Sequence, residues 1–277
     1  MFKRVTIIGL GLIGGSLALA IKEKKLAKKV RGVSRRKSTI GFAAKNKIVD
    51  FATLDIEEGA RDSDLLIIAT PVLKIPAMAK AAAPFLKKGA IITDAGSTKA
   101  RVSKDIKKAG LKGMNFIGSH PIAGSEKSGI RSADKDIFKG AKCVMTRTKD
   151  TEPGAFNKLK KFWTKLGMRV IEMSPDSHDK RLSKISHLPH ALSVSLVNSV
   201  GKNDLKLAAK GFRDTTRIAS GEPELWKDIF LTNKDNLIKD IKRVKKELSR
   251  IEAVLRKNDE KGLLRLLAKA KTVRDSL

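Results

Sequence analysis

The sequence has little of several residue types, and each shortage excludes some classes of protein. It contains one cysteine, Cys143, so no disulfide can form within the chain, which fits a reducing compartment. It has no tyrosine, and aromatic residues make up 4% of the chain, which leaves few platforms for stacked nucleobases. No apolar run approaches the roughly 18 residues of a membrane-spanning helix. Because residues 1–4 lead directly into an apolar strand, there is no room for a signal peptide. We therefore expect a soluble cytoplasmic protein that has no membrane partner.

Acidic residues are also scarce, and the formal net charge of the 277 residues is +30. A charge of this size is typical of proteins that bind nucleic acid. Its distribution argues against that function, because residues 1–170 hold 36 basic and 14 acidic residues and the remainder holds 23 and 15, without a basic arm or block. We expect no nucleic-acid partner. A positive field that speeds the capture of small anions is the other explanation.

A glycine pattern dominates the start of the chain. Gly9, Gly11 and Gly14 have the spacing G-x-G-x-x-G between an apolar, strand-like run and a helix-forming segment. The first glycine allows a tight turn, the second lets the backbone approach a pyrophosphate, and the third lets helix and strand pack closely. Leu12 and Ile13 belong to the same turn, where the helix N-terminus presents free N–H groups to phosphates. The pattern predicts a dinucleotide-binding site.

The end of the predicted second strand, residues 29–34, bears on the choice of cofactor. In a dinucleotide-binding unit an acidic residue at this position holds the ribose 2′-hydroxyl of NAD. Here the position carries Ser34, followed by Arg35 and Arg36. A hydroxyl and two guanidinium groups suit a 2′-phosphate better, which favours NADP. NAD stays open as the alternative, in which the arginines stack on the adenine or face solvent.

Strand-like and helical segments alternate as far as residue 173. Strands are predicted near 29–34, 65–69, 90–94, 115–121, 143–146 and 169–173, and helices over 39–47, 72–86 and 153–166. This alternation predicts an α/β fold, with residues 1–173 forming a doubly wound, mostly parallel Rossmann-type domain. Ligands of such sheets bind at the carboxyl ends of the strands. Thr70, Pro71, Ser97 and His120 lie at such ends, so we expect them to converge on one crevice.

From residue 174 onward helical periodicity replaces the strand-like runs, and residues 174–277 are predicted to form a second, all-helical domain. Its longest apolar stripe has steps of three and four residues and consists of Leu237, Ile238, Ile241, Val244, Leu248, Ile251 and Val254. A second amphipathic helix is predicted over 261–273. The stripe could pack within the chain, but its length favours a homodimer that forms through the helical domain.

Histidine occurs four times, and all four positions are informative. His120 follows a predicted strand, whereas His178, His187 and His190 lie in the first part of the helical domain. On a helix, positions 178, 182, 185 and 186 fall near one face. Since no cluster of cysteines or carboxylates accompanies these histidines at the spacing of metal ligands, we predict no metal site.

Five motifs together resemble the prephenate/arogenate dehydrogenase family of tyrosine biosynthesis. They are the glycine turn and the segments 94–99, 118–129, 178–190 and 211–219, in the family's order and over nearly the whole chain. The resemblance implies the oxidative decarboxylation of a cyclohexadienol. A hydride passes from the carbon of the 4-hydroxyl group to a nicotinamide, the ring carboxylate leaves as CO2, and aromatisation drives the step.

The same resemblance implies roles for individual residues. His120 would be the base for the 4-hydroxyl group, and Ser97 would orient that hydroxyl and the histidine. Arg217, rather than Arg213, would pair with a carboxylate of a dicarboxylate substrate.

Further residues would surround the substrate. His187 and His190 would line the pocket, or would serve as helix caps beside a proline. Ser125 would contact the substrate, Glu126 would guard the mouth of the pocket, and Trp226 would form a wall of the pocket or part of the dimer interface.

The substrate stays open between two relatives. Ser125 and Glu126, with the paired histidines 187 and 190, resemble users of prephenate. Arogenate, which carries an amine in place of the keto group, and dual specificity are the alternatives. We expect no ACT regulatory domain or chorismate mutase, since the sequence stops near residue 277.

Two other functions are open at this stage. A β-hydroxyacid or imine-type dehydrogenase shares the expected architecture but requires a catalytic lysine, for which only Lys180 and Lys184 are near. A basic nucleic-acid-binding protein on a dinucleotide fold is the non-enzymatic alternative.

Overall fold

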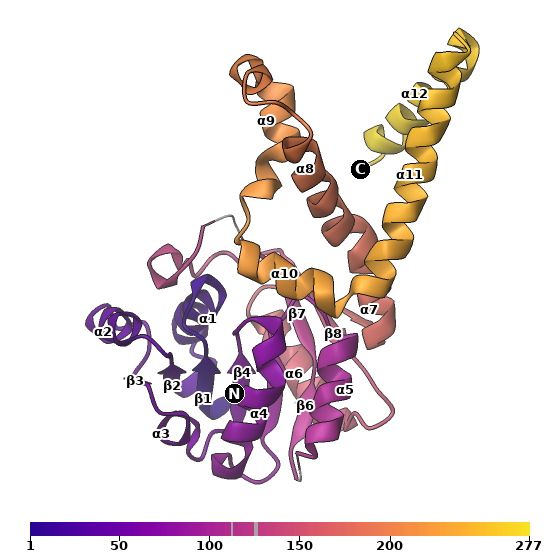
Figure 1. Cartoon of the computed structure of the whole chain (residues 1–277). Coiled ribbons are helices and arrows are strands. Elements are labelled where there is room, and N and C mark those ends of the chain that lie inside the picture. The colour runs from indigo at the N-terminus through magenta and orange to yellow at the C-terminus, as the bar shows by residue number, and fades with distance from the viewer. Residues whose placement is uncertain (112, 125–126) are drawn as a thin grey trace.

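The computed structural model describes residues 1–111, 113–124 and 127–277. In this part of the chain the sheets end at Met173, and only helices follow from Pro175 onward. Figure 1 shows the α/β part below and the helical part above it.

Six parallel strands form the first sheet, in the order β3-β2-β1-β4-β5-β6. They are β1 (Phe2–Ile8), β2 (Ala27–Val33), β3 (Phe51–Thr53), β4 (Leu65–Ile68), β5 (Ile91–Asp94) and β6 (Asn115–Ile117). The order confirms the predicted Rossmann-type fold, because strand order reverses between β1 and β4. The sequence did not predict the short edge strand β3.

Both faces of this sheet are covered by helices, as its apolar strands require. The helices are α1 (Leu12–Glu23), α2 (Lys37–Lys45), α3 (Ile56–Ala60), α4 (Ile75–Ala82), α5 (Ala100–Ala109) and α6 (Pro153–Lys165), with single turns η1 (Val72–Lys74), η2 (Ala83–Phe85) and η3 (Ile130–Ser132). Successive side chains of β4 take opposite faces: Leu65 and Ile67 pack in one core with α1 and α6, and Leu66 and Ile68 pack in another with α3, α4 and α5.

Three further strands form a separate sheet. β7 (Ser119–Ile122) is antiparallel to β8 (Lys142–Thr146), which is parallel to β9 (Arg169–Met173). The prediction that residues 143–146 and 169–173 are the last strands of the main sheet is therefore wrong.

The chain leaves the first sheet at Gly118. A Cβ at this glycine would lie 2.6 Å from Oγ1 of Thr146, so only glycine allows the close approach of the two sheets. The prediction of one strand over 115–121 is therefore wrong, and His120 lies inside β7, opposite Val144, rather than at the end of a strand.

The helical part begins with a continuous helix over residues 175–198, which contains a π-helical turn over residues 183–187. The helices are α7 (Pro175–Leu182), η4 (Ser183–His187), α8 (Leu188–Asn198), η5 (Asp204–Leu207), α9 (Lys210–Thr216), η6 (Arg217–Ser220), α10 (Pro223–Thr232), α11 (Lys234–Arg256) and α12 (Glu260–Asp275).

The segment η4 is π-helical, and Pro189, which has no N–H to donate to residue 185, lies two residues beyond its end. The wider turn changes the phase of the helix: Ile185 is 73% exposed, whereas His178 and Leu182 are buried. The predicted common face of residues 178, 182, 185 and 186 is therefore wrong.

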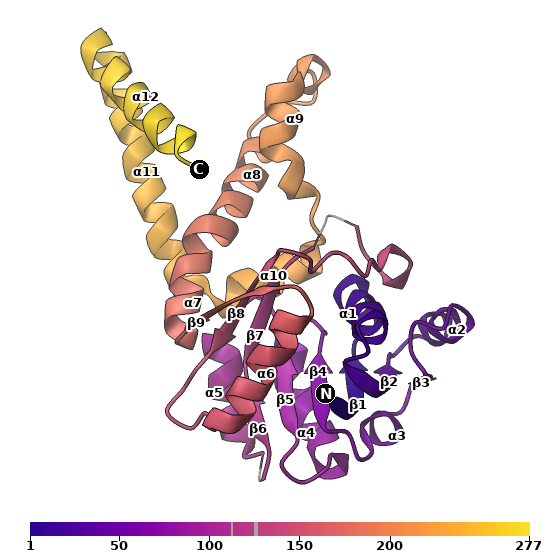
Figure 2. The ribbon, with the colours of Figure 1, turned by 180° about the vertical axis from the view of Figure 1, so that it is seen from behind.

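Two helices dock the helical part onto the carboxyl ends of the first sheet. α10 packs on η1, directly after Thr70 and Pro71, and α7 packs on α5. Beyond these contacts α8–α9 and α11–α12 diverge as two arms, which Figures 1 and 2 show from opposite sides. Leu237 at the base of α11 is buried, whereas Ile238, Leu248 and Ile251 farther along the stripe are exposed.

Candidate active site

The glycine turn has the geometry that its spacing predicts. Gly9 has φ +98°, and a Cβ there would lie 2.5 Å from the carbonyl oxygen of Ala69. A Cβ at Gly14 would lie 1.9 Å from the carbonyl oxygen of Gly9, so helix and strand meet at this point. A Cβ at Gly11 would meet nothing within 4 Å, so the backbone of the second glycine is open to a ligand. This cradle fits a pyrophosphate.

The N-terminus of α1 lies at the same place. Gly11 is its N-cap residue, and no side chain caps the first turn, which contains no acidic residue. The first N–H groups of a helix, here those of Leu12 and Ile13, have no carbonyl partner within it. Thr70, which Pro71 follows, lies beside the turn, with Cγ2 3.1 Å from the position of a Cβ at Gly9.

The residues after β2 carry basic charge. Ser34 is half-buried, its N–H donates to the carbonyl oxygen of Thr53 at 3.1 Å, and its Oγ accepts from the N–H of Arg36 at 3.4 Å. Arg35 and Arg36 are exposed. A hydroxyl and two guanidinium groups thus lie near the position where the 2′-substituent of a bound ribose would be expected.

His120 is joined to the helical part by a chain of hydrogen bonds. Its Nδ1 lies 2.8 Å from Nε2 of His178, and Nδ1 of His178 lies 2.7 Å from Oδ1 of Asp179. The carboxylate of Asp179 also accepts from the backbone N–H groups of Lys99 at 2.8 Å and Ala100 at 2.9 Å. His178 and Asp179 are buried, and His120 is half-buried.

A buried ion pair lies beneath this chain. Asp94, at the end of β5, pairs with Nζ of Lys99, and both side chains are fully buried. Asp94 also accepts from the N–H groups of Gly96 at 2.9 Å and Ser119 at 3.2 Å, so its charge is well satisfied. Burial lowers the pKa of His120 well below its usual value, and the neighbouring His178, Lys99 and His187 lower it further. His120 is therefore neutral at physiological pH and able to accept a proton.

His187 presents a donor without a partner. Its Nδ1 accepts from Nδ2 of Asn233 at 3.1 Å, and the same amide group donates to the carbonyl oxygen of Asp179 at 2.8 Å. Nδ2 of Asn236 donates to Oδ1 of Asn233 at 2.8 Å, which fixes the orientation of the amide. The proton of neutral His187 therefore lies on Nε2, a buried atom that has no hydrogen-bond partner in the described part of the chain. Burial is the main cause that lowers the pKa of His187 to about 4.

His190 lies next to an aromatic cluster. Its ring stacks on Trp226 with centroids 3.5 Å apart and an angle of 9° between the planes, and Phe230 contacts both rings edge-on. Nδ1 of His190 is also buried without a partner among the described residues. Gly221 leaves space for this stack, since a Cβ there would lie 2.4 Å from Nε1 of Trp226. Two buried, unpartnered imidazole nitrogens are typical of a polar ligand site.

The remaining predicted residues that the structure describes lie in three separate segments. Ser97 is half-buried in the loop between β5 and α5, and the next residue, Thr98, bonds with Oγ1 of Thr232 in α10 at 2.9 Å. Arg217 is exposed in η6, four residues before Gly221, and Arg213 is exposed in α9. Ser125 and Glu126 lie outside the described residues.

The structure adds residues to which the sequence assigned no role. His178, Asp179, Asp94 and Lys99 lie inside the quoted motifs, so their positions were already marked, but their contacts were not predictable. Asn233 lies between α10 and α11, where nothing in the sequence distinguishes it from a capping residue.

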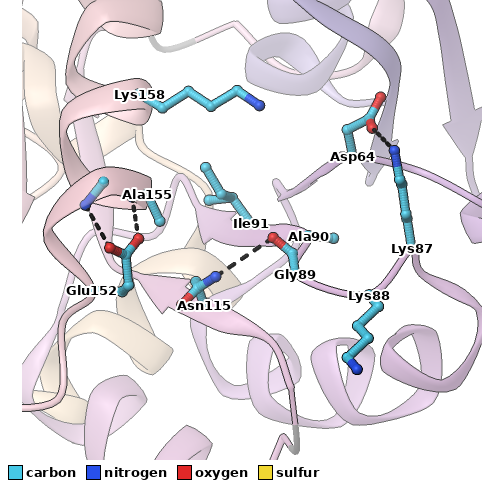
Figure 3. A pocket seen from close by; sticks show the side chains of 11 residues that line it. Asp64, Lys87, Lys88, Gly89, Ala90, Ile91, Asn115, Glu152, Ala155 and Lys158 are labelled. Atoms are coloured by element: carbon cyan, nitrogen blue, oxygen red, sulfur yellow. Dashed lines mark hydrogen bonds and ion pairs between the residues drawn. The ribbon is translucent and has the colours of Figure 1, made fainter.

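Two cavities lie away from these residues. One, of about 260 Å³, opens at the amino ends of β5 and β6, where Figure 3 shows Lys87 beside Asp64, and Glu152 bonded to the first amides of α6. The other, of about 980 Å³, lies between α5, the segment that follows β8 and the start of α7.

Among the described residues no group of three or more His, Cys, Asp or Glu side chains could hold a metal ion. No helix in the same residues is long and apolar enough to cross a membrane.

Comparisons with known proteins bear on the family of the chain. Residues 17–172 match the family model of the prephenate dehydrogenase nucleotide-binding domain, and residues 174–269 match that of the prephenate dehydrogenase dimerization domain. Prephenate dehydrogenase of Bacillus subtilis is 35% identical over 284 residues, covering 100% of this chain and 76% of the relative. Cyclohexadienyl dehydrogenase of Zymomonas mobilis is 33% identical over 259 residues and 88% of both chains.

A solved structure extends the likeness to three dimensions. Prephenate dehydrogenase of Aquifex aeolicus, in complex with hydroxyphenyl propionate and NAD+, superposes with a TM-score of 0.93 at 32% identity, covering 100% of this chain and 98% of that one. With both family models matched in sequence order and the fold shared over its whole length, the chain belongs to the prephenate dehydrogenase family.

Proposed function

We propose that the protein oxidises and decarboxylates prephenate to 4-hydroxyphenylpyruvate, with a nicotinamide dinucleotide as the hydride acceptor. The observation that carries the proposal is the meeting of all four histidines, His120 from the α/β part and the other three from the helical part, near the carboxyl ends of the first sheet. Neutral His120 and the unpartnered donor of His187 supply a base and a hydrogen-bond donor to a polar substrate.

The chain's own residues would divide the reaction among them. His120 takes the proton of the 4-hydroxyl group as the hydride leaves its carbon, and Ser97 orients that hydroxyl. Nε2–H of His187 donates to a substrate oxygen, and Arg217 pairs with a carboxylate. The nicotinamide supplies the electrophilic carbon that receives the hydride. The ring carboxylate then leaves as CO2, and the electron pair of the broken bond completes the aromatic ring.

The placement of the lysines does not favour a β-hydroxyacid or imine-type dehydrogenase. Lys180 and Lys184 are both exposed, whereas His187, in the same run of helix, is buried. The fully buried Lys99 is paired with Asp94. The side chain that is hydrogen-bonded to His120 is a histidine, His178, rather than a lysine.

For the cofactor we favour NADP over NAD. The support is the absence of a carboxylate at position 34 and the exposed pair Arg35 and Arg36 beside it. NAD remains the alternative, since the structure of the Aquifex aeolicus relative contains NAD+.

Arogenate is the second candidate substrate, which the likeness to cyclohexadienyl dehydrogenase supports.

The decisive experiment measures the reduction of NADP and NAD at 340 nm with prephenate and with arogenate, at equal concentrations of each cofactor. We expect the largest kcat/KM for prephenate with NADP. Absence of turnover with all four pairs would contradict the proposed function, and faster turnover of arogenate would replace the substrate.

We also propose a homodimer that forms through the helical arms. Apolar side chains exposed on α11 and α12 support it, because a monomer rarely leaves a stripe of this length in water; they include Leu248, Ile251, Leu255, Leu264 and Leu267. Light scattering after gel filtration should give twice the mass of the chain. Leu255→Asp should shift the protein toward the monomer, and a wild-type protein that is monomeric at micromolar concentration would contradict the proposal.

A further inference from the structure

We propose that His178 and Asp179 form a positioning dyad that holds His120 in the tautomer with its proton on Nδ1, and thereby makes Nε2 the basic atom. The proposal deepens the proposed function and rests on it for the identity of the reaction. Neither His178 nor Asp179 contacts the reacting atoms, so both residues act through His120.

Donor and acceptor can be assigned consistently to each hydrogen bond from Asp179 through His178 to His120. The carboxylate of Asp179 only accepts, so Nδ1 of His178, at 2.7 Å from Oδ1, must donate. Neutral His178 then has a lone pair on Nε2, and Nδ1 of His120, at 2.8 Å from it, must donate in turn. The lone pair of neutral His120 is left on Nε2. This is the atom that a general base needs.

Asp179 is held in its acceptor role by the backbone. The N–H groups of Lys99 and Ala100 donate to its two oxygens at 2.8 and 2.9 Å. These amides open α5, so the carboxylate also acts as a buried cap at the start of that helix. The carboxylate thus has three donors around it, two on Oδ1 and one on Oδ2, which together fix the orientation of its plane.

The dyad crosses the boundary between the two parts of the chain. His120 lies in β7 and the amides lie at the start of α5, whereas His178 and Asp179 lie in α7. Asn233, after α10, ties the carbonyl oxygen of Asp179 to Nδ1 of His187. The tautomer of His120 therefore depends on the docking of α7 on α5, and the base is competent only when both parts of the chain are joined.

The charges around His120 fit this role. Lys99 and Asp94 lie beneath it from the end of β5 and the start of α5, and His187 approaches it from η4. Burial, His178, Lys99 and His187 keep the pKa of His120 low, so its protonated form is disfavoured. A buried carboxylate two hydrogen bonds away stabilises the imidazolium that forms during the reaction.

Asp179→Asn tests the dyad with minimal change of shape. Asparagine has one accepting oxygen, so its NH2 group must replace Oδ1, where it faces His178 and the N–H group of Lys99, or Oδ2, where it faces the N–H group of Ala100. If the NH2 group faces His178, Nδ1 of His178 becomes an acceptor. Both tautomers are then reversed, and the proton of His120 lies on Nε2. By analogy with other oriented histidine bases, kcat should fall by about 10²- to 10⁴-fold, while KM for substrate and cofactor changes by less than about threefold.

Tautomers are read directly by two-bond 15N–1H correlation spectra of protein labelled with 15N-histidine, since the chain has only four histidines. We expect His120 in the Nδ1–H form in the wild type and a shift toward the Nε2–H form in Asp179→Asn. His178→Gln, whose amide can accept from His120, should keep more of kcat than His178→Leu, which can neither accept nor donate. This second pair of variants decides the question if Asp179→Asn does not fold.

Asp240→Asn is the matched control. Asp240 is a buried aspartate that accepts from Oγ of Ser183, directly after α7, at 2.7 Å and from Arg243 at 3.2 Å; its hydrogen bonds among the described residues do not involve His120, His178 or Asp179. It should lose stability while the tautomer of His120 and kcat stay unchanged. An equal loss of kcat in Asp240→Asn and Asp179→Asn would overturn the dyad in favour of a general loss of docking.

Two further results would overturn the proposal: wild-type His120 in the Nε2–H form, or an unchanged tautomer and kcat in Asp179→Asn. The spectra need no substrate. If the wild type turned over neither prephenate nor arogenate, the proposed function would fail while the tautomer of His120 would still decide the dyad.

Discussion

His187 makes the free energy of unfolding depend on pH in a defined window. Its pKa is about 4 in the folded protein and about 6.5 in an unfolded chain. Above pH 6.5 the histidine is neutral in both states, and its contribution to stability is complete. As the pH falls from 6.5 to 4, the unfolded chain takes up a proton that the folded protein refuses, so stability falls by up to about 1.4 kcal/mol per pH unit. Below pH 4 both states are protonated, and the total loss is about 3 kcal/mol.

His187→Asn isolates this contribution. The asparagine oxygen can replace Nδ1 of His187 as the acceptor for Asn233, so the hydrogen bond of 3.1 Å is retained. The variant has no titrating group at this position. The variant should therefore be less stable than the wild type at pH 7.5, because it leaves a small cavity, and should lose about 3 kcal/mol less between pH 7 and pH 4. The other histidines titrate in both proteins and cancel in the difference.

The assay is urea unfolding, followed by far-UV circular dichroism, at half-unit steps from pH 4 to pH 7.5 and constant ionic strength. Ile229→Val serves as the control, because it removes a buried methyl group from α10, the helix that carries Trp226, without removing a titrating group, and its effect should not depend on pH. A difference between His187→Asn and the wild type that stays constant with pH would refute the reasoning. It would mean that His187 is protonated as easily in the folded protein as in water.

Three further variants test the site. His120→Asn should lower kcat by about 10²- to 10⁴-fold and leave the fluorescence-measured Kd of the cofactor within about twofold; unchanged turnover would remove His120 from its role as the base. Arg217→Ala should raise KM for the substrate by about 10- to 100-fold through the loss of a charge-assisted contact, with little effect on KM for the cofactor; an equal rise in both constants would indicate a structural effect. Ser34→Asp should raise the ratio of kcat/KM for NAD to that for NADP by at least about tenfold, by repulsion of the 2′-phosphate, and an unchanged ratio would show that other residues hold that phosphate.

The charge of the chain has a partial explanation in this arrangement. Prephenate and both dinucleotides are anions, so a positive field would speed their capture. The basic residues nearest to the predicted ligands, Arg35, Arg36 and Arg217, are nevertheless few beside a net charge of +30. No contact among the described residues explains the rest of the excess.

The sequence alone determined those features whose signals are local. The glycine spacing predicted the turn at Gly9 and the N-terminus of α1, because a positive φ and close approaches of the backbone exclude other residues. The alternation of short apolar runs with helices predicted the fold, and the periodicity after residue 173 predicted the helical part. These signals depend on steric limits and on hydrophobic period, which act within a few residues of one another.

The tertiary structure decided which residues meet. Gly118 lets β7 leave the first sheet and form another with β8 and β9, so His120 lies inside a strand where the sequence predicted the end of one. The π-helical turn before Pro189 buries His187 and exposes Ile185. The partners of His120 come from 58 residues away along the chain. Hydrogen bonds of this range depend on how separate elements dock, and no local propensity encodes them, so only the folded chain brings the base and its positioning dyad together.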